Sequence, residues 1–174
     1  MALDDKDAIW TFISWGRPFK LVTSLLDCSS PDTTPIQVEC GWGYSCALTA
    51  SGTVLVWWPL GEAIQQRFTI KMHEMDTARN TQAHATREGE IPCSCWDLDF
   101  DPLHVPPLPE LPNIRGDDES GEVKLVKVAA MDGFLIGLTN KGHVLKFGDL
   151  SNELTLQHGR WEYVGYVHRR YRLD

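Results

Sequence analysis

The chain has 174 residues, the length of one ordinary domain and enough to bury a sizeable core. Its hydrophobic content of 43% and charged content of 23% are typical of a soluble globular protein, and no apolar run approaches the ~18 residues of a membrane helix. The formal net charge is −8. Such an acidic balance argues against direct binding to nucleic acid, because phosphate contacts need clusters of basic residues.

The N-terminal segment, MALDDKDAIW, is acidic where a secretory signal would be basic. It therefore predicts a cytoplasmic or nuclear protein that is not secreted. Residues 9–21 carry aromatic and apolar side chains and predict the end of a first β-rich unit. Residues 21–35 follow as a linker, and Thr34-Pro35 is expected to enter the next strand in an extended conformation.

Residues 36–58, IQVECGWGYSCALTASGTVLVWW, predict three strands. Residues 36–40 alternate apolar and polar side chains, which predicts a strand whose inward face carries Ile36, Val38 and Cys40. Gly41-Trp42-Gly43 predicts a turn in which two glycines permit positive φ. Residues 45–49 and 53–58 predict two further strands, joined by a turn at Gly52. The result is an antiparallel meander, the body of one propeller blade.

Residues 126–148 repeat this segment after a shift of ninety positions and without a gap. The identities fall at apolar strand positions and turn glycines: Val38/Val128, Gly43/Gly133, Leu48/Leu138, Thr49/Thr139, Gly52/Gly142, Val54/Val144 and Leu55/Leu145. A shorter third copy is FISWG at residues 12–16, which matches VLVWW at residues 54–58. A repeated supersecondary unit marks a solenoid or propeller. We therefore predict an all-β fold, a partial β-propeller built of antiparallel meander blades.

The regular spacing fails over residues 59–122, which predict either a degenerate blade or a long insertion. Residues 64–72 alternate weakly and are expected to form a strand, and residues 76–90 are expected to be a polar loop. Six prolines lie between residues 92 and 112, including PPLPELP at 106–112, which predicts an extended polyproline-like segment. Because residues 87–122 also hold ten acidic and two basic residues, the insertion is both Pro-rich and acidic.

Three parts follow in chain order. Residues 1–58 hold the end of a first blade and the first full repeat, residues 59–122 the insertion, and residues 123–174 the second full repeat and the start of another blade. A closed propeller typically needs four to eight four-stranded blades, and at ~40–60 residues a blade this chain supplies two to three. We therefore expect a fragment of a longer propeller or the product of a truncated reading frame.

The first copy resembles the regulator of chromosome condensation repeat. That family's pattern runs Cys-Gly-x-x-His-(Thr/Ser)-x-Ala-Leu and then x-x-x-Gly-x-Val-Tyr-x-Trp-Gly. The positions of this pattern are filled here by Cys40, Gly41, Ser45, Ala47, Leu48, Gly52, Val54 and Trp57. Tyr44 stands where the family has His, and Trp58 where it has Gly. The second copy departs further, with Ala130-Met131, Phe134 and Gly137 in place of Cys-Gly, His and Ala.

The resemblance implies a propeller, a fold that serves exchange factors, inhibitors and substrate receptors. The chain is most similar to fungal receptors that join such a propeller to an F-box and select substrates for ubiquitination. The implied function is a non-catalytic protein-interaction module with a protein partner, and contact with ubiquitin ligase components would require an F-box outside this sequence. The alternatives are a guanine-nucleotide exchange factor for a small GTPase and a non-functional propeller fragment. Neither nucleic acid nor a membrane is an expected partner.

The five cysteines are Cys28, Cys40, Cys46, Cys93 and Cys95. Cys93 and Cys95 could offer two thiolates to zinc, with His104 or Cys28 completing the site, but the sequence lacks the usual pair of Cys-x-x-Cys knuckles. Cys40 and Cys46 are expected to act as small buried apolar residues. We therefore expect free thiols and no metal, and no disulfide in a reducing compartment.

No other motif in the sequence indicates a catalytic site. Asp97-Leu98-Asp99-Phe100-Asp101 begins like a calcium loop, but Pro102 and Leu108 stand where that loop needs Gly and Glu. The sequence contains no Gly-x-Ser-x-Gly, no phosphate-binding Gly-rich loop with Lys and no His-Glu-x-x-His, and its six histidines show no ligand spacing. We predict no catalytic residue, no cofactor and no metal ligand.

Two groups of candidate residues remain. The repeat assigns structural roles to Gly41, Gly43, Leu48, Gly52, Val54, Trp57, Gly133, Leu138, Gly142, Val144 and Phe147. Possible partner-binding residues are Trp42, Tyr44, Pro106, Pro107, Leu108 and Pro109, since PPLPELP suits an aromatic groove; its alternative role is to cover a sheet edge of this chain. Open blade flanks also predict self-association, through exposed Trp10, Phe12, Trp15, Trp57, Trp58 and Phe147.

Overall fold

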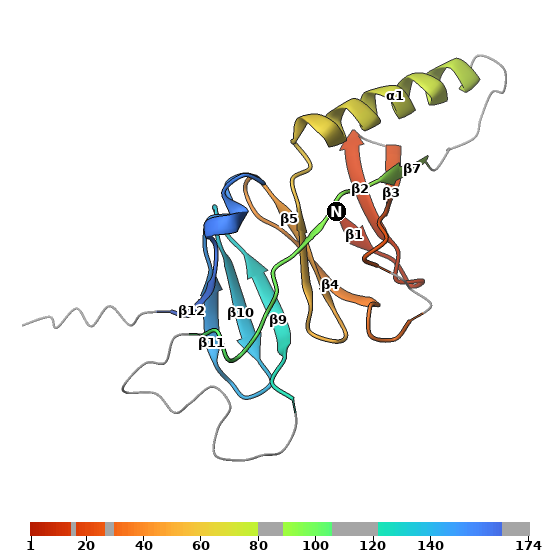
Figure 1. Cartoon of the computed structure of the whole chain (residues 1–174). Coiled ribbons are helices and arrows are strands. Elements are labelled where there is room, and N and C mark those ends of the chain that lie inside the picture. The colour runs from red at the N-terminus through yellow and green to blue at the C-terminus, as the bar shows by residue number, and fades with distance from the viewer. Residues whose placement is uncertain (15–16, 27–29, 80–88, 106–121, 165–174) are drawn as a thin grey trace, which may run out of the picture.

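The computed structural model describes residues 1–14, 17–26, 30–79, 89–105 and 122–164, and it arranges them as three four-stranded sheets and one long helix (Figure 1). The candidate PPLPELP segment, with Pro106, Pro107, Leu108 and Pro109, lies outside these residues, as do Trp15 and Cys28. The three sheets stand side by side, and we name them the N-terminal, central and C-terminal sheets.

The central and C-terminal sheets contain the two predicted meanders. The central sheet has the order β4 (Pro35–Cys40), β5 (Ser45–Thr49), β6 (Val54–Trp57) and β8 (Trp96–Asp97). The C-terminal sheet consists of β9 (Leu125–Ala130), β10 (Leu135–Thr139), β11 (Val144–Phe147) and β12 (Trp161–Tyr163), again paired in chain order. All these pairings are antiparallel, and the first three strands of each sheet differ by the ninety positions of the repeat. The shared meander, and with it the partial all-β propeller, is confirmed.

The two copies also share their second turn. Gly52 and Gly142 have φ angles of 95° and 84°, where a side chain is strained. In each copy the glycine amide donates to the threonine three residues before it, at 3.0 Å. The two glycines, ninety positions apart, therefore have the same backbone conformation and make the same hydrogen bond.

The first turn corrects one expectation. Gly133 has a φ of 70°, but its counterpart Gly43 does not adopt positive φ, and neither does Gly41. Gly41 is instead required by space, since a Cβ there would lie 2.6 Å from the Met131 carbonyl oxygen and against the Tyr44 ring. Close approach of the neighbouring sheet, rather than turn geometry, selects glycine at this position.

The N-terminal sheet departs from the meander. It has the order β1 (Ala2–Leu3), β2 (Ile9–Ser14), β3 (Arg17–Val22) and β7 (Gly89–Pro92), and β7 runs parallel to β3. The FISWG fragment begins in β2, the second strand of this sheet, whereas its match VLVWW begins in β6, the third strand of the central sheet. Five residues of apolar alternation predict a strand but do not fix its place in a sheet.

Residues 64–72 form a helix, not the expected strand, because they belong to α1 (Glu62–Arg79). The helix contains no Gly or Pro, and it also takes in residues 76–79 of the expected loop. One stripe with helical spacing packs against the N-terminal sheet: Ile64, Phe68, Met72 and Met75. Within the described residues, no helix is both long enough and apolar enough to cross a membrane.

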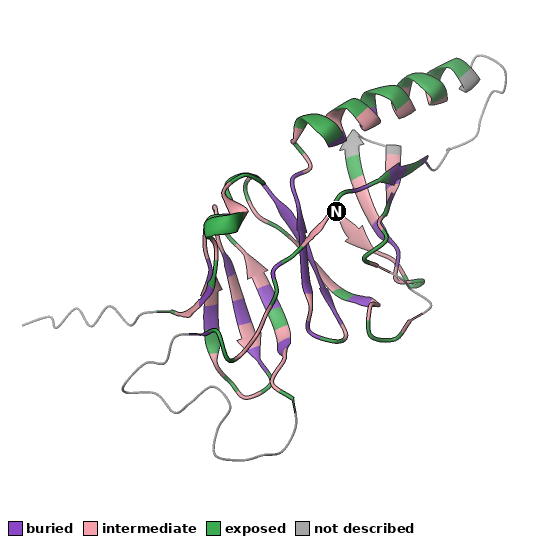
Figure 2. Cartoon of the chain, in the orientation of Figure 1, coloured by how far each residue is buried: buried purple, intermediate pink, exposed green. Residues whose placement is uncertain are grey.

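The central sheet is covered on both faces, as a propeller blade is between its neighbours (Figure 2). One face packs against the C-terminal sheet through Cys46, Leu48, Val54 and Val56, which are at most 1% exposed. The other face contributes Ala47 and Trp57 to a second core with the N-terminal sheet and α1. Strands β5 and β6 are therefore buried along their whole length.

Strand β4 corrects the predicted inward face. Ile36 is 51% exposed, Val38 is half-buried and Cys40 is exposed. The register shifts between Pro35 and Gln37, and it is the Gln37 amide that reaches the next sheet. Its Nε2 donates to the Val128 carbonyl at 2.7 Å, and its Oε1 accepts from the Val128 amide at 3.1 Å. A polar residue thus joins two blades by satisfying backbone groups, which apolar periodicity does not predict.

The expected list of exposed aromatic residues is also corrected. Trp57, Trp58 and Phe147 are buried, with at most 6% of their surface exposed, because each lies between two sheets. Phe12 is 54% exposed and Trp10 is half-buried.

Candidate functional site

Four connections meet at one end of the central and C-terminal sheets, and we call this surface the loop end. It comprises residues 41–44, 58–62, 131–134 and 148–155, which begin where β4, β6, β9 and β11 finish. The Trp58 indole donates to the Leu150 carbonyl at 3.0 Å, and the Leu150 amide donates to the Gly133 carbonyl at 2.9 Å. In Figure 1 the β4–β5 hairpin and the loop after β11 accordingly lie side by side.

The loop end carries the most exposed large apolar side chains of the described residues. Trp42 is 86% exposed, Leu154 78% and Leu60 73%. Met131, whose backbone approaches Gly41 and Tyr44 in the turn of the central sheet, is 44% exposed. A tryptophan at this level of exposure has no packing role in the chain itself, so the surface is a candidate for contact with a partner.

The charged residues within the four connections of the loop end are all acidic, although the Lys146 ammonium of β11 stands over the Phe134 ring, 5.1 Å from its centroid. The four connections contain Glu62, Asp132, Asp149 and Glu153, and they contain no lysine, arginine or histidine. The exposed apolar side chains thus share these connections with four carboxylates. Such a surface is electrostatically complementary to a basic partner.

Tyr44 corrects the sequence-based list of partner-binding residues. It is 1% exposed, and its hydroxyl group lies between the two blades. There it donates to the Phe134 carbonyl and accepts from the Met131 amide at 3.2 Å. Burial raises the pKa of the phenol, so the hydroxyl remains protonated and able to donate. Tyr44 therefore joins the blades, and it is not available to a partner.

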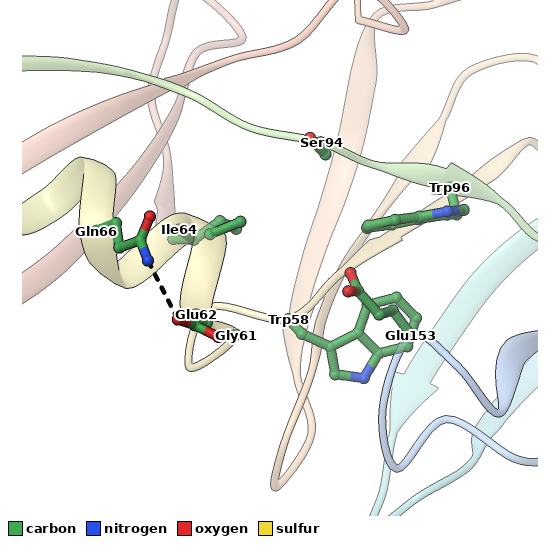
Figure 3. A pocket seen from close by; sticks show the side chains of 9 residues that line it. Trp58, Gly61, Glu62, Ile64, Gln66, Ser94, Trp96 and Glu153 are labelled. Atoms are coloured by element: carbon green, nitrogen blue, oxygen red, sulfur yellow. Dashed lines mark hydrogen bonds between the residues drawn. The ribbon is translucent and has the colours of Figure 1, made fainter.

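A cavity of about 410 Å³ opens at the start of α1 (Figure 3). Trp58 and Trp96 form one wall, with their ring centroids 5.3 Å apart and edge to face. The rest of the lining includes Glu62 and Ile64 of the helix and Glu153 of the loop after β11. The cavity thus combines apolar side chains with two carboxylates, as the loop end does at the surface.

The candidates for structural roles in the repeat differ in their burial. Leu48, Val54, Trp57 and Phe147 are buried, whereas Leu138 is half-buried and Val144 is 46% exposed. Sequence reasoning missed Leu60, Met131 and Leu154 as exposed residues. A single apolar residue in a turn carries no sequence signal that separates it from a core residue.

The described cysteines are free, but they differ in their surroundings. Burial raises the pKa of Cys46 to about 12, which makes it a small inert core residue. Cys40 was expected to be buried as well, but it is exposed at the end of β4, although Val38 on the same strand packs against the core of the N-terminal sheet. Across the described ranges no three side chains of the His, Cys, Asp and Glu types come together as a metal site would require.

No protein-family model matches the sequence, and no curated protein matches it. Among solved structures, the chain is similar to human WBSCR16, with a TM-score of 0.35 and 18% identity over 75% of this chain and 23% of that one. It is also similar to yeast RCC1 (Prp20), solved with Kap60 bound, with a TM-score of 0.36 and 16% identity over 76% of this chain and 22% of that one. The chain thus spans less than a quarter of these structures. The assignment of a partial propeller rests on the three four-stranded sheets of the chain itself.

Proposed function

We propose that the chain is a non-catalytic protein-interaction module whose loop end binds a basic protein surface. The observation that carries the proposal is the exposure of Trp42, Leu60 and Leu154 on connections that also contain four acidic residues. Tryptophan is enriched among the few residues that contribute most of the binding energy at protein interfaces. The acidic rim adds steering and selects against acidic partners.

Propellers present binding loops at the ends of their blades, on a scaffold of rigid strands. In this chain Tyr44 and Gln37 fix the central sheet to the C-terminal sheet, so the turns that carry Trp42 and Met131 keep a constant spacing. A preorganised apolar patch loses little conformational entropy on binding. The rigid seam between the blades therefore supports recognition at the loop end.

The resemblance of residues 40–57 to the chromosome condensation regulator repeat favours a finer proposal. According to this finer proposal, the loop end selects substrates for a ubiquitin ligase by binding a basic segment of the substrate. This finer proposal includes residence in the cytoplasm or the nucleus.

The test compares Trp42→Ala with Ile70→Ala. Both side chains are exposed, at 86% and 61%, but Ile70 lies on α1 away from the loop end. Each tagged chain is incubated with extract of the source cells, and the retained proteins are quantified by mass spectrometry. We expect Trp42→Ala to weaken retention of a defined set of proteins about tenfold, the loss of about 1.4 kcal/mol at a hot spot. Ile70→Ala retains that set.

The partner chemistry is tested in the same assay. Retention by the native chain is expected to fall as salt is raised, because the charges at the rim are exposed and therefore screened. Equal retention by Trp42→Ala and the native chain would contradict the proposal. So would a retained set of acidic proteins that is insensitive to salt.

A further inference from the structure

Two cysteines lie on the connection between β7 and β8, which joins the N-terminal sheet to the central sheet. The sulfur atoms of Cys93 and Cys95 are 3.8 Å apart and share a hydrogen bond. Both thiols are free. The Cys93 amide donates to the Val22 carbonyl at 2.8 Å, which fixes the start of this connection against the edge of β3.

The backbone places the two sulfur atoms on one side. Cys93 is buried, Ser94 is exposed and Cys95 is half-buried, the alternation of an extended segment. An extended pair at i and i+2 has its Cα atoms about 6.6 Å apart. That separation lies inside the range of roughly 4.4–6.8 Å that disulfides span, near its upper end. The Cβ atoms of such a pair are also about 6.6 Å apart, whereas a disulfide needs about 3.5–4.5 Å, so closure of the bond bends the backbone at Ser94 and gives a strained disulfide that is readily reduced again.

The two thiols are not equivalent. The hydrogen bond with Cys93 lowers the pKa of Cys95, with help from Thr23, although burial acts in the opposite direction. The same hydrogen bond and burial raise the pKa of Cys93. Cys95 is also the more accessible of the two. Its lowered pKa and greater exposure make Cys95 the thiol that an oxidant reaches first, and Cys93 the resolving thiol.

We propose that Cys93 and Cys95 form a redox site that peroxide converts reversibly to a disulfide. The Cys95 thiolate attacks one oxygen of hydrogen peroxide, which yields the Cys95 sulfenic acid and hydroxide. The Cys93 sulfur, as it gives up its proton, then attacks the Cys95 sulfur and displaces hydroxide, which takes up a proton to become water. In sum, two thiols and one peroxide give one disulfide and two waters. An external thiol returns the pair to its reduced state by exchange.

This site is independent of the proposed binding function, but it lies beside the loop end. Ser94, the residue between the two cysteines, lines the cavity formed by Trp58, Trp96 and Glu153 (Figure 3). Closure of the disulfide therefore acts on the backbone that forms one wall of that cavity.

The test is peroxide treatment of the reduced full chain, followed by alkylation and mass spectrometry of its peptides. We expect the peptide with Cys93 and Cys95 to lose the mass of two hydrogens and to resist alkylation, until dithiothreitol restores both thiols. Cys40→Ser, a change at an exposed cysteine outside the pair, is the control and forms the same disulfide. Alkylation of both Cys93 and Cys95 after peroxide, or a disulfide joining any other pair, would overturn the proposal.

Two variants separate the proposed roles. In Cys93→Ser the Cys95 sulfenic acid has no resolving thiol, and we expect dimedone to trap it. In Cys95→Ser we expect neither dimedone labelling nor a disulfide at Cys93. Dimedone labelling at Cys93 rather than Cys95 would reverse the assigned order, and this part of the proposal would be wrong. Because Cys93 is buried, peptide mapping of the native chain serves as the test that does not depend on a variant.

Discussion

Tyr44 shows at the scale of one residue how the two blades are joined. Its phenol fills the place between the blades, and its hydroxyl group bridges the Met131 amide and the Phe134 carbonyl. Those two groups also bond to each other at 2.9 Å, so neither loses its last partner when the hydroxyl is removed. The family pattern that the sequence resembles has His at this position, and Tyr44 replaces it with a longer donor that reaches the adjacent sheet.

We predict that Tyr44→Phe lowers the free energy of unfolding by about 1 kcal/mol, the net value of a buried hydrogen bond. The control is Tyr163→Phe, because the Tyr163 hydroxyl bonds to His143 in a less buried place and its loss is expected to have a smaller effect. Urea denaturation followed by tryptophan fluorescence measures both values. An unchanged midpoint for Tyr44→Phe would show that the hydroxyl does not stabilise the seam.

The exposure of Trp42 could be predicted from the sequence, but the burial of Tyr44 could not. Trp42 lies between two glycines, where a large aromatic side chain finds no strand position to occupy. Tyr44 follows the same turn by only two residues, yet it is buried, because the neighbouring sheet approaches at that point. The separation of a contact residue from a core residue thus depends on tertiary packing, which a local pattern does not contain.

At the scale of elements, the two second turns offer a matched pair of glycines. Gly52 and Gly142 share a positive φ, but a Cβ on Gly52 would lie 2.8 Å from the Lys124 side chain and 3.0 Å from the Leu125 backbone. A Cβ on Gly142 would meet nothing within 4 Å. The same backbone conformation therefore occurs once in a crowded place and once in an open one.

We predict that Gly142→Ala costs about 1 kcal/mol of unfolding free energy, the strain of a left-handed alanine. Gly52→Ala has the same strain and also clashes with the C-terminal sheet, so it is expected to cost at least twice as much. Chemical denaturation of the two variants, in parallel with the native chain, gives the comparison. An equal or larger loss for Gly142→Ala would show that the central turn is not held against β9.

The repeat made both meanders predictable, because turn glycines and apolar strand positions recur at a fixed interval. Helix α1 was missed because its apolar stripe of Ile64, Phe68, Met72 and Met75 is narrow and interrupted by Ile70, which is 61% exposed. Strand β7 escaped prediction for a different reason. It pairs in parallel with β3, more than sixty residues away, and only tertiary contact specifies such a pairing.

At the scale of the whole molecule, the C-terminal sheet has one face that the repeat leaves unmatched. In the central sheet the corresponding face consists of Cys46, Leu48, Val54 and Val56, and it is covered by the C-terminal sheet. The residues ninety positions later are Ile136, Leu138, Val144 and Lys146, and all of them are half-buried or exposed. Lys146 stands over the Phe134 ring, 5.1 Å from its centroid, and shields part of the face. Among the described residues nothing packs over the rest of this face, which we call the open blade flank.

An open flank predicts self-association of the chain. Each large apolar side chain left without a partner forgoes roughly 2 kcal/mol of burial, and two or three of them amount to a large part of a domain's net stability of ~5–15 kcal/mol. The net charge of −8 opposes association and is expected to reduce it without abolishing it.

The most direct test of the partial propeller is light scattering of the purified chain over a range of concentrations, combined with thermal unfolding. We predict a mass that rises above that of the monomer with concentration. Val144→Glu, on the open flank, is expected to lower the average mass toward that of the monomer. Ile70→Glu, on the exposed side of α1, is expected to leave the average mass unchanged. A monodisperse native monomer with one cooperative transition above ~60 °C, beyond most of the usual mesophile range, would contradict the account.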